Sequence, residues 1–366
     1  MDYRSIETRA IVNCGLKNIK NPFFYYMTEK NKFSIDKMGG INYMSIAFYV
    51  TPFINAIVRS GTTEEKDMVF KSFLQMYAFE EIPSGKRGHK GELVPRVEEA
   101  VRIATNVKAR QTKLQDTTMS LLESKIKDND LLDNAIIIIE CEPGEVEKNL
   151  AGLVANKLMA KYQRPCLVLI KSKTQEDKEV FLRGSARNYS MSEIQDMRQL
   201  CENTGLVEYA QGHESAFGIS IPESNLNSFI ETTNEIYSEV PQEPIYWVDY
   251  IWNITRINKQ IILDIADSKN YWGQEIPEPY ICIQNLDLGQ TQIQGLSMDK
   301  HPTLKIHLNN GVDIMKFKSS EEELEEFSKP NQILTAVCRC NKNEWMGNVT
   351  PQLIVEDYIL REEWIF

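Results

Sequence analysis

The fold of this chain is decided by residues 135–170, which read AIIIIECEPGEVEKNLAGLVANKLMAKYQRPCLVLI. The apolar, β-branched run Ala135–Glu140 predicts a buried strand, a helix is expected at Glu147–Lys161, and Pro165–Ile170 predicts a second buried strand. Because alternating strands and helices are typical of α/β proteins, we predict an α/β domain over residues 128–240. Its further elements are expected at Glu179–Arg183, Met191–Thr204, Gly218–Ile221 and Leu226–Glu239.

The sequence before this domain is predicted to be helical. Residues 1–96 read as several helices, and residues 97–127 contain neither proline nor glycine, which predicts one long connecting helix. At about 1.5 Å per residue this helix would span roughly 45 Å, enough to bridge two domains. The shorter helices are expected at Arg4–Asn18, Pro52–Ser60 and Thr63–Ala78.

The sequence after the α/β domain is mostly β. From Pro241 onward, short strands and one acidic helix near Ser319–Phe327 predict an OB-like β-barrel over residues 241–366. The predicted fold class is therefore a multidomain α/β plus β protein. The strands are expected at Pro244–Trp252, Tyr280–Asn285, Thr303–Leu308, Val312–Phe317, Ile333–Cys340 and Gln352–Tyr358.

The composition is that of a soluble globular protein, with 42% hydrophobic and 25% charged residues among 366. The formal charge of −11 argues against a surface that coats nucleic acid uniformly, although a local basic groove can still bind it. Seven cysteines without a C-x-x-C pair indicate buried thiols, and the expected compartment is the reducing cytoplasm. No apolar run approaches the roughly 20 residues that span a bilayer, so no membrane partner is expected.

No metal-binding or nucleophile motif is evident in the sequence. The chain has four histidines and no H-E-x-x-H, Walker or G-x-S-x-G motif. Asp128 and Asp130 resemble a metal-binding D-x-D pair, but they follow a helix, and a helix-ending turn is the favoured interpretation. The glutamates between residues 321 and 326 are expected to form a solvated helix face. We therefore predict no metal ligands in this chain.

Two segments contain residue types suited to binding phosphate. Residues 183–187, RGSAR, are expected between a strand and a helix. There a glycine lets the backbone approach an anion closely, a hydroxyl donates one hydrogen bond, and a guanidinium can bind two phosphate oxygens. A surface loop with an ion-paired arginine explains these residues equally well. In residues 211–218, QGHESAFG, His213 lies next to Gly212 just before a strand. It can donate to a phosphate or satisfy a loop carbonyl instead.

Further candidate contacts with DNA are spread over the chain. Asn55 and Arg59 lie one turn apart on an amphipathic helix, where Arg59 is either structural or a guide for a strand. Arg110 lies on the long helix. The basic loop at residues 86–90 either touches a DNA backbone or is solvated. Trp345 either stacks on bases, as aromatic residues of OB folds do, or packs in a hairpin.

Taken in order, six segments of the chain resemble RecJ, the single-strand-specific exonuclease family of the DHH phosphoesterase superfamily. Two are similar to the family's P-R-I-N-A-A-G-R and N-x-x-R-Q motifs. The others resemble the start of the DHH-associated domain, its G-S-x-R and G-G-H-x-x-A-A-G motifs, and two parts of the OB domain. The six are Thr51–Arg59, Asn106–Gln111, Leu150–Pro165, Gly184–Arg187, Gly212–Gly218, and Pro277–Pro279 with Asn343–Leu353.

The chain departs from these family motifs at several positions. Phe53 stands in place of an arginine, and one extra residue separates Asn106 from Arg110. Gln211 and Phe217 depart from the G-G-H-x-x-A-A-G motif. These departures suggest a divergent, phage-type branch of the family.

The resemblance implies a role for each of these residues. Ser185 and Arg187 would bind the 5′-phosphate of single-stranded DNA and so set polarity, and His213 would lie beside the scissile phosphate as a catalytic residue. Arg59 would line a gateway too narrow for duplex, and Trp345 would help an OB domain to hold the trailing strand. The residues expected to contact phosphate or DNA are Ser185, Arg187, Gly184, Gly212, Gly218, Arg59, Asn55, Arg110 and Trp345.

The resemblance also implies a division of labour. Residues 1–96 would be the helical C-terminal part of a DHH domain, and residues 128–240 the DHH-associated domain. The motifs that hold Mn²⁺ or Mg²⁺ in the family are expected upstream of Met1. The chain would thus be the part of a 5′→3′ exonuclease of DNA repair and recombination that binds single-stranded DNA. Its expected partners are an upstream DHH domain or a single-strand-binding protein. The alternatives are a protein-interaction scaffold, and a phosphodiesterase for small phosphodiesters such as nanoRNA or cyclic dinucleotides.

Overall fold

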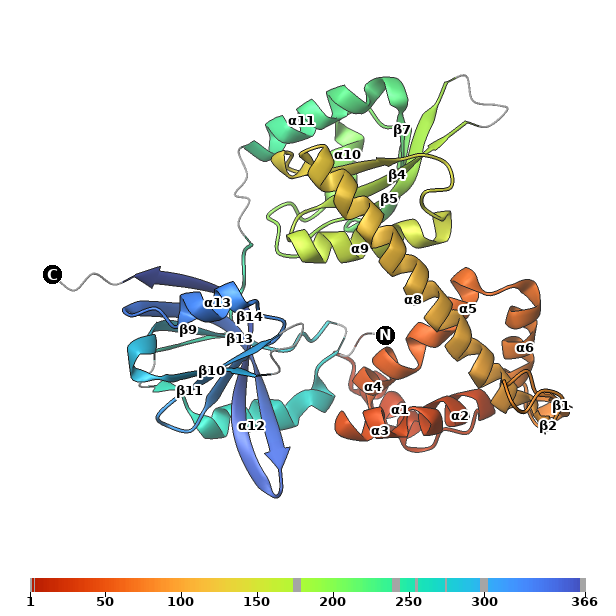
Figure 1. Ribbon diagram of the computed structural model, residues 1–366, viewed down its shortest axis with the longest axis horizontal. Helices are drawn as coiled ribbons and strands as arrows, with labels where there is room; N and C mark the ends of the chain where they lie inside the picture. The colour runs from red at the N-terminus through yellow and green to blue at the C-terminus, as the bar shows by residue number, and fades with distance from the viewer. Residues whose placement is uncertain are drawn as a thin grey trace. The chain divides into compact units, whose positions relative to one another are not determined.

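The computed structural model describes residues 2, 4–173, 179–238, 244–253, 256–273, 275–296 and 302–362. Contacts between residues divide the chain into two compact units (Figure 1). One unit comprises Asn18–Ile245, and the other comprises Met1–Lys17 together with Tyr246–Phe366. Residue 241, at which the β-rich part is predicted to begin, lies outside the described residues.

The first part of the Asn18–Ile245 unit is a group of short helices around an apolar core that includes Phe23, Ala56 and Val107. Side chains satisfy the free backbone groups at helix starts: the side-chain oxygen Oδ1 of Asn21 accepts from the Phe23 N–H at 3.1 Å. The helices are α2 (Pro22–Lys30), α3 (Lys32–Lys37), α4 (Tyr43–Tyr49), α5 (Thr51–Ser60), α6 (Thr63–Phe73) and α7 (Gln75–Ala78), and α1 (Ile6–Lys17) belongs to the other unit.

The prediction of one helix over Thr63–Ala78 is wrong. Thr62 and Glu65 form a capping box at the start of α6. The helix ends at Phe73, because Leu74 has an extended backbone (ψ 114°), and the short helix α7 follows. Neither a proline nor a glycine indicates this break in the sequence. The basic loop at residues 86–90 is exposed between two short paired strands, β1 (Glu81–Pro83) and β2 (Leu93–Pro95).

The long helix α8 runs over Arg96–Asp128, one residue beyond each end of the predicted range. Its buried side chains recur every three or four residues and so form one stripe along the helix. Apart from Glu99, the stripe is apolar up to Val107 and again from Leu122, whereas its middle consists of buried Gln111, Gln115 and Thr118. This polar middle lies between the helical region and the α/β region of the same unit.

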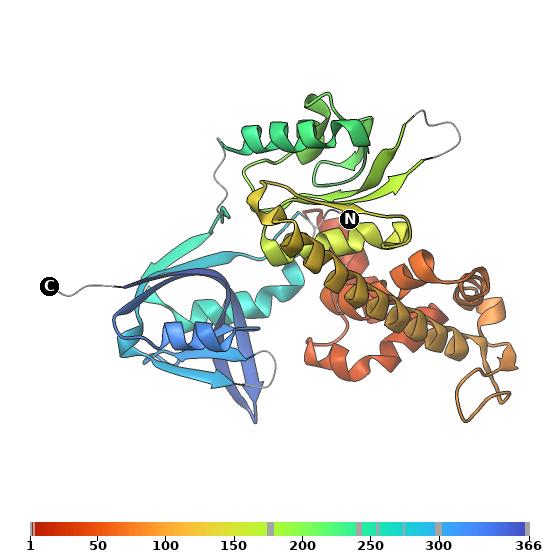
Figure 2. The ribbon, with the colours of Figure 1, turned by 45° about the horizontal axis from the view of Figure 1, so that its top comes forward.

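The α/β region is a five-stranded sheet with helices on both faces (Figure 2). The strand order is β3-β4-β5-β7-β6, with β3 and β4 parallel and the other neighbours antiparallel. One face packs on α8 and α9 through residues such as Ile137 and Val168, and the other packs on α10 and α11. The elements are β3 (Ile137–Cys141), α9 (Lys148–Tyr162), β4 (Cys166–Ser172), β5 (Phe181–Arg187), α10 (Met197–Asn203), β6 (Tyr209–His213), β7 (Ala216–Pro222) and α11 (Leu226–Ser238).

Two local predictions in this region are wrong. Residues 183–187 do not form a loop between a strand and a helix, because β5 continues through them to Arg187. Residues 211–213 belong to an additional strand, β6, rather than to a loop. Both segments are polar and rich in small residues, and backbone pairing with β7 stabilises them as strands.

The C-terminal unit is a seven-stranded sheet in the order β10-β11-β12-β14-β13-β9-β8. Strands β9 and β10 follow one another in the chain, separated by a short 3-10 turn at Leu288–Gln290, yet they lie towards opposite ends of this order. The strands are β8 (Tyr250–Asn253), β9 (Tyr280–Asp287), β10 (Gln292–Leu296), β11 (Thr303–His307), β12 (Asp313–Lys316), β13 (Gln332–Trp345) and β14 (Asn348–Glu362), with helices α12 (Lys259–Asp267) and α13 (Glu321–Phe327).

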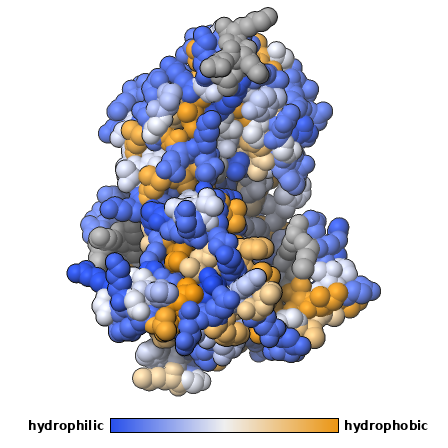
Figure 3. Space-filling model, turned by 90° about the vertical axis from the view of Figure 1, so that its right-hand side faces the viewer, coloured by the Kyte–Doolittle hydropathy of each residue, from blue (hydrophilic) through white to orange (hydrophobic). Residues whose placement is uncertain are grey.

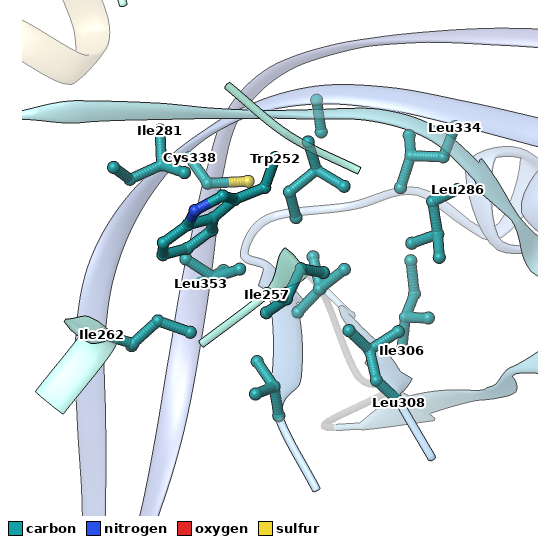
Figure 4. Close-up of a cluster of buried hydrophobic side chains, with 14 of the residues drawn as sticks. Trp252, Ile257, Ile262, Ile281, Leu286, Ile306, Leu308, Leu334, Cys338 and Leu353 are labelled. Atoms are coloured by element: carbon teal, nitrogen blue, oxygen red, sulfur yellow. The ribbon is translucent and has the colours of Figure 1, made fainter. Parts of the chain in front are cut away.

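This sheet confirms the predicted β-rich domain. Within the described residues the hydrogen-bonded ladder ends at β10 on one side and at β8 on the other. The core contains Trp252, Ile281 and Cys338, which are buried together with apolar residues of the other strands (Figure 4). Helix α12 and strand β10 are additional elements that the sequence did not reveal. The fold class of a multidomain α/β plus β protein is therefore confirmed.

The surface of the molecule mixes apolar and hydrophilic side chains. Figure 3 shows, on one face, apolar areas separated by hydrophilic ones. Large exposed apolar residues in the helical region include Phe33 and Phe70. In the part of the chain that the structure describes, we find no helix with the length and hydropathy needed to cross a bilayer.

The cysteines allow a direct test of the fold. Of the seven free thiols only Cys14 is exposed, and the other six are buried. Burial raises the pKa of Cys141 to about 11 and that of Cys201 to about 12, so their reactive thiolates are scarce at neutral pH. We expect an aromatic disulfide reagent to label one thiol rapidly in the folded protein and all seven after denaturation. Rapid labelling of several thiols without denaturant would contradict the described core.

Candidate nucleic-acid interface

The sheet of the α/β region brings the predicted phosphate-binding residues into two adjacent rows. In the register of β5, β7 and β6, Ser185 lies opposite Gly218, and Gly218 lies opposite Gln211. Two residues further along, Arg187 lies opposite Ala216 and Ala216 opposite His213. Because paired residues, and residues two apart, project on the same side of a sheet, all six share one face.

This face is the one that α9 partly covers. The β3 and β4 half carries apolar side chains, such as Val168 and Cys166, against α9. Val168 is the pairing partner of Ser185, which places Ser185 on the same face at the edge of that cover. On β6 the side chains of Gln211 and His213 are exposed. The β5-β7-β6 half of this face therefore carries polar and small side chains, whereas the β3-β4 half carries the apolar side chains that pack on α9.

Gly152 of α9 lies directly against the arginine and the serine. A Cβ atom at this position would lie 2.5 Å from Nη2 of Arg187 and 3.4 Å from the Ser185 hydroxyl oxygen. Glycine inside a helix costs roughly 0.5–1 kcal/mol relative to alanine, so its presence here requires a reason. The close approach of Arg187 supplies that reason. We did not predict a role for Gly152 from the sequence, although a glycine inside a predicted helix was an available signal.

Two other glycines of the motifs are required by the backbone, one by close packing and one by its conformation. A Cβ atom on Gly184 would lie 1.9 Å from the carbonyl oxygen of Val168, so only glycine allows β5 to approach β4 this closely. Gly212 has a φ of +136° and lies against Phe217, a conformation that other residues rarely adopt. Gly218 is less constrained, with its nearest neighbours 3.8 Å from the Cβ position.

Arg187 is half-buried and positively charged beside a second arginine. Burial lowers the pKa of the Arg187 guanidinium from its usual range, and the positive charge of Arg59 lowers it further. Its Nη1 donates to the carbonyl oxygen of Ala186 at 2.6 Å. Within the described residues no carboxylate forms an ion pair with Arg187. The alternative of an ion-paired arginine therefore does not hold for Arg187, although Arg183 in the same segment is paired with Glu208 at 3.6 Å.

Arg59 reaches this region from α5. The Asn149 amide, on the first turn of α9, donates to the Arg59 carbonyl oxygen at 3.1 Å and so joins the two helices. The side chains of Asn55 and Arg59 are both exposed, one turn apart on α5. The structure thus brings Arg59, Ser185 and Arg187 together from two distant parts of the sequence. Asn55 lies one turn further along the same helix.

His213 lies on the edge strand β6, with its side chain exposed. Within the described residues its ring makes no hydrogen bond to a loop carbonyl, which was the alternative to a functional role. It shares the row of Arg187 across the sheet.

Arg110 is engaged in contacts of its own. Its guanidinium forms an ion pair with Glu65 at 2.8 Å and donates to the Ser60 carbonyl oxygen at 3.2 Å. These contacts hold the end of α5 and the start of α6 against α8. Arg110 therefore stabilises the packing of α5 and α6 on α8. A DNA phosphate could bind Arg110 only in competition with the Glu65 carboxylate.

Trp345, in the C-terminal unit, lies at the tip of the hairpin formed by β13 and β14. Figure 1 shows this hairpin extending beyond the rest of its sheet. Trp345 is 68% exposed and its neighbour Met346 is 86% exposed. The ring therefore does not pack within the hairpin, and its surface is available for stacking.

The described residues offer no set of donors for a metal ion. No three histidine, cysteine, aspartate or glutamate side chains among them are grouped as metal ligands. Mn²⁺ and Mg²⁺ need several oxygen ligands around one point. These residues therefore do not fit the divalent ions that the resemblance implies for the complete enzyme.

A shallow groove of about 680 Å³ lies elsewhere, at the C-terminal end of α8. It is lined by Glu123, Lys127 and Tyr162 among others, and by none of the predicted site residues. We therefore assign the candidate site to the open sheet face rather than to this groove.

Comparisons with known proteins agree with this architecture. Residues 248–357 match the family described as the RecJ OB domain. The fold resembles the crystal structures of RecJ from Thermus thermophilus in complex with Mn²⁺ (TM-score 0.65, 17% identity) and with Mg²⁺ (TM-score 0.62, 16% identity). Each match covers 98% of this chain, and 47% and 49% of the two RecJ chains. The fold over nearly the whole chain is thus similar to that of RecJ.

The chain is also similar in sequence to proteins named as single-strand DNA-specific exonucleases. It is 33% identical over 356 residues to the SPbeta prophage-derived YorK of Bacillus subtilis (strain 168) and to yorK of Bacillus phage SPbeta, covering 96% of this chain and 60% of each relative. Against RecJ of Bacillus subtilis it is 24% identical over 366 residues, covering 98% of this chain and 42% of RecJ. The chain is therefore similar in sequence to these exonucleases, with a match to the RecJ OB domain over residues 248–357, and it spans about 60% of the length of its prophage and phage relatives.

Proposed function

We propose that this chain binds single-stranded DNA and recognises its 5′-phosphate, as part of a RecJ-like 5′→3′ exonuclease. The observation that supports this proposal most directly is the open sheet face on which Arg187 and Ser185 lie beside Gly152, with the charge of Arg59 close by. A half-buried guanidinium without a carboxylate partner is a site for an anion. The relatives named as single-strand DNA-specific exonucleases make a DNA end the fitting anion.

The residues of the site have complementary roles in this proposal. The Arg187 guanidinium donates two hydrogen bonds to oxygens of the terminal phosphate, and the Ser185 hydroxyl donates a third. Arg59 adds positive charge from α5. Gly152 and Gly218, on the same face as Ser185 and Arg187, leave room for the phosphate to reach the sheet, whereas Gly184 lets β5 approach β4. His213, in the row of Arg187, would lie beside the adjacent phosphodiester.

Hydrolysis belongs to the complete enzyme in this proposal. RecJ structures with Mn²⁺ and Mg²⁺ support divalent-metal use in the family, and the described residues of this chain do not offer the ligands. We propose that an upstream DHH domain supplies them, and that a single-strand-binding protein is a further partner. Trp345 and the OB domain would hold the trailing strand by stacking. Free, mostly buried cysteines support the cytoplasm as the compartment, and DNA repair and recombination as the setting remain part of the proposal.

Substituting Gly152 tests the proposed site without altering any charge. In Gly152→Ala the new methyl group would occupy the position 2.5 Å from Arg187 Nη2 and would push the guanidinium away from Ser185. We expect the affinity for 5′-phosphorylated single-stranded DNA to fall about five-fold. The free energy of unfolding should meanwhile rise by up to about 1 kcal/mol, because alanine favours the helix. Fluorescence anisotropy of a 3′-labelled oligonucleotide and thermal unfolding measure the two quantities.

The matched control for this test is Gly15→Ala in α1. Gly15 is also inside a helix, and no atom lies within 4 Å of its Cβ position. This variant should gain stability and keep its affinity. If Gly152→Ala binds phosphorylated and unphosphorylated strands as the unmodified protein does, the phosphate is not bound at Arg187 and Ser185.

A further inference from the structure

A second group of cations lies where α5, α8 and α9 meet. Lys108 is half-buried on α8, one turn after buried Ala104 and one turn before buried Gln111. It therefore occupies a core-facing position at the point where the buried stripe of α8 turns polar. A lysine in such a position is expected to have a partner of opposite charge.

The surroundings of Lys108 supply positive rather than negative charge. Its ammonium Nζ donates to the Gln111 amide oxygen at 3.4 Å, and within the described residues it has no ion pair with a carboxylate. Burial lowers the pKa of Lys108, and the charges of Lys157 and Arg59 lower it further, while Asp116 opposes them. Asp116 itself lies 3.4 Å from Lys157. Lys108 and Lys157 thus share the carboxylate of Asp116 while Arg59 adds a third positive charge near Lys108, an arrangement that costs free energy unless an anion binds.

A continuous chain of contacts joins this group to the proposed 5′-phosphate site. Gln111, which accepts from Lys108, donates from its Nε2 to the Ser60 hydroxyl at 3.1 Å. The next residue back, Arg59, is joined to α9 by the Asn149 amide. Three residues after Asn149, Gly152 lies against Arg187. Arg59 is therefore the residue that the two cation groups have in common.

We propose that Lys108, together with Arg59 and Lys157, binds a backbone phosphate of the same strand, beyond the 5′ end. This inference rests on the proposed function, and it adds a second phosphate site to it. A single strand carries a phosphate at each nucleotide, so a strand whose terminal phosphate lies at Arg187 can place a later phosphate beside Arg59 and Lys108. The ligand is an internal phosphodiester, which strands with and without a 5′-phosphate both contain. Lys108 consequently contributes to affinity, and Arg187 to recognition of the end.

The substitution Lys108→Met separates these two contributions. Methionine keeps much of the side-chain length and removes the charge from a half-buried position, so folding should be preserved, which thermal unfolding checks. The probes are 3′-labelled oligothymidylates of about 12 nucleotides, with and without a 5′-phosphate. We expect affinity to fall about five-fold for both strands. The slope of log affinity against log salt should become shallower by about 0.7, the value for one phosphate contact on a single strand.

The matched control is Lys113→Met, which removes an exposed lysine from α8 five residues further along. This variant should bind both strands nearly as well as the unmodified protein does. An unchanged affinity and slope in Lys108→Met, with preference for the 5′-phosphate intact in the unmodified protein, would overturn the second site and leave the proposed function standing. A loss confined to the phosphorylated strand would also overturn it, because Lys108 would then belong to the end site. If the unmodified protein shows no preference for the 5′-phosphate, the proposed function is contradicted, and the second site, which rests on it, is contradicted with it.

Discussion

Replacing Gly184 with alanine is expected to prevent β4 and β5 from pairing. A Cβ atom at this position would lie 1.9 Å from the carbonyl oxygen of Val168 and 2.8 Å from its carbonyl carbon. These are backbone atoms of the neighbouring strand, so they cannot rotate away as the end of a flexible side chain can. Overpacking a well-packed interior typically costs about 1–3 kcal/mol, and we expect at least about 3 kcal/mol here because two strands would have to separate.

The positions of the tryptophans allow the loss of stability to be measured separately for the two units. All five tryptophans lie in Tyr246–Phe366, so their fluorescence reports the C-terminal unit, whereas circular dichroism reports both units. We expect Gly184→Ala to lower the thermal transition seen by circular dichroism by roughly 6–12 °C or to remove it. The tryptophan transition should remain near its original temperature.

Gly218→Ala is the matched control for stability. Gly218 lies on the neighbouring strand β7 of the same sheet, and the nearest atoms to its Cβ position are 3.8 Å away. An added methyl group there makes an ordinary contact, so the transition should shift little. Equal thermal stability of the two variants would show that the close approach of β5 to β4 is not what requires a glycine at position 184.

The sequence predicted the elements that have a strong apolar pattern, and it predicted polar strands less well. The runs at Ala135–Glu140 and Pro165–Ile170 predicted β3 and β4, because buried parallel strands are apolar on both faces. Strand β6 was missed because Gln211, Gly212 and His213 carry no apolar pattern, and only the ladder with β7 makes them a strand. Strand order along a sheet is a long-range property, so the sequence predicted most strands of the C-terminal domain but not that its hydrogen-bonded ladder, in the described residues, ends at β10 and β8.

The same distinction applies to the candidate site. The residue types at Ser185 and Arg187 indicated phosphate binding, and their place on one sheet face follows from the register with β7. That Arg59 approaches Arg187 depends on the packing of α5 on α9, and no local pattern encodes it. Arg110 had the right chemistry, but its ion pair with Glu65 became visible only in the structure.

Replacing Arg187 with alanine is expected to produce the largest functional loss. A hydrogen bond to a charged group contributes about 1.5–3 kcal/mol, and the guanidinium can donate two to one phosphate. Affinity for a 5′-phosphorylated single strand should therefore fall about thirty-fold, which corresponds to about 2 kcal/mol. Affinity for the same strand with a 5′-hydroxyl should change only about two-fold, because no terminal phosphate is present to lose contact. Anisotropy titrations of the two strands measure the ratio.

Two further variants identify what the arginine contributes. Arg187→Lys keeps the charge but loses the planar fork, so it should recover only part of the preference for the 5′-phosphate. Arg198→Ala removes an arginine from α10, where it is paired with Glu202 at 2.9 Å and Asp196 at 3.6 Å, and it should leave the preference intact. Because α10 packs on the opposite face of the sheet, this control alters net charge equally without touching the site. If Arg187→Ala weakened both strands to the same extent, Arg187 would be a general backbone contact, and recognition of the DNA end would have to reside elsewhere.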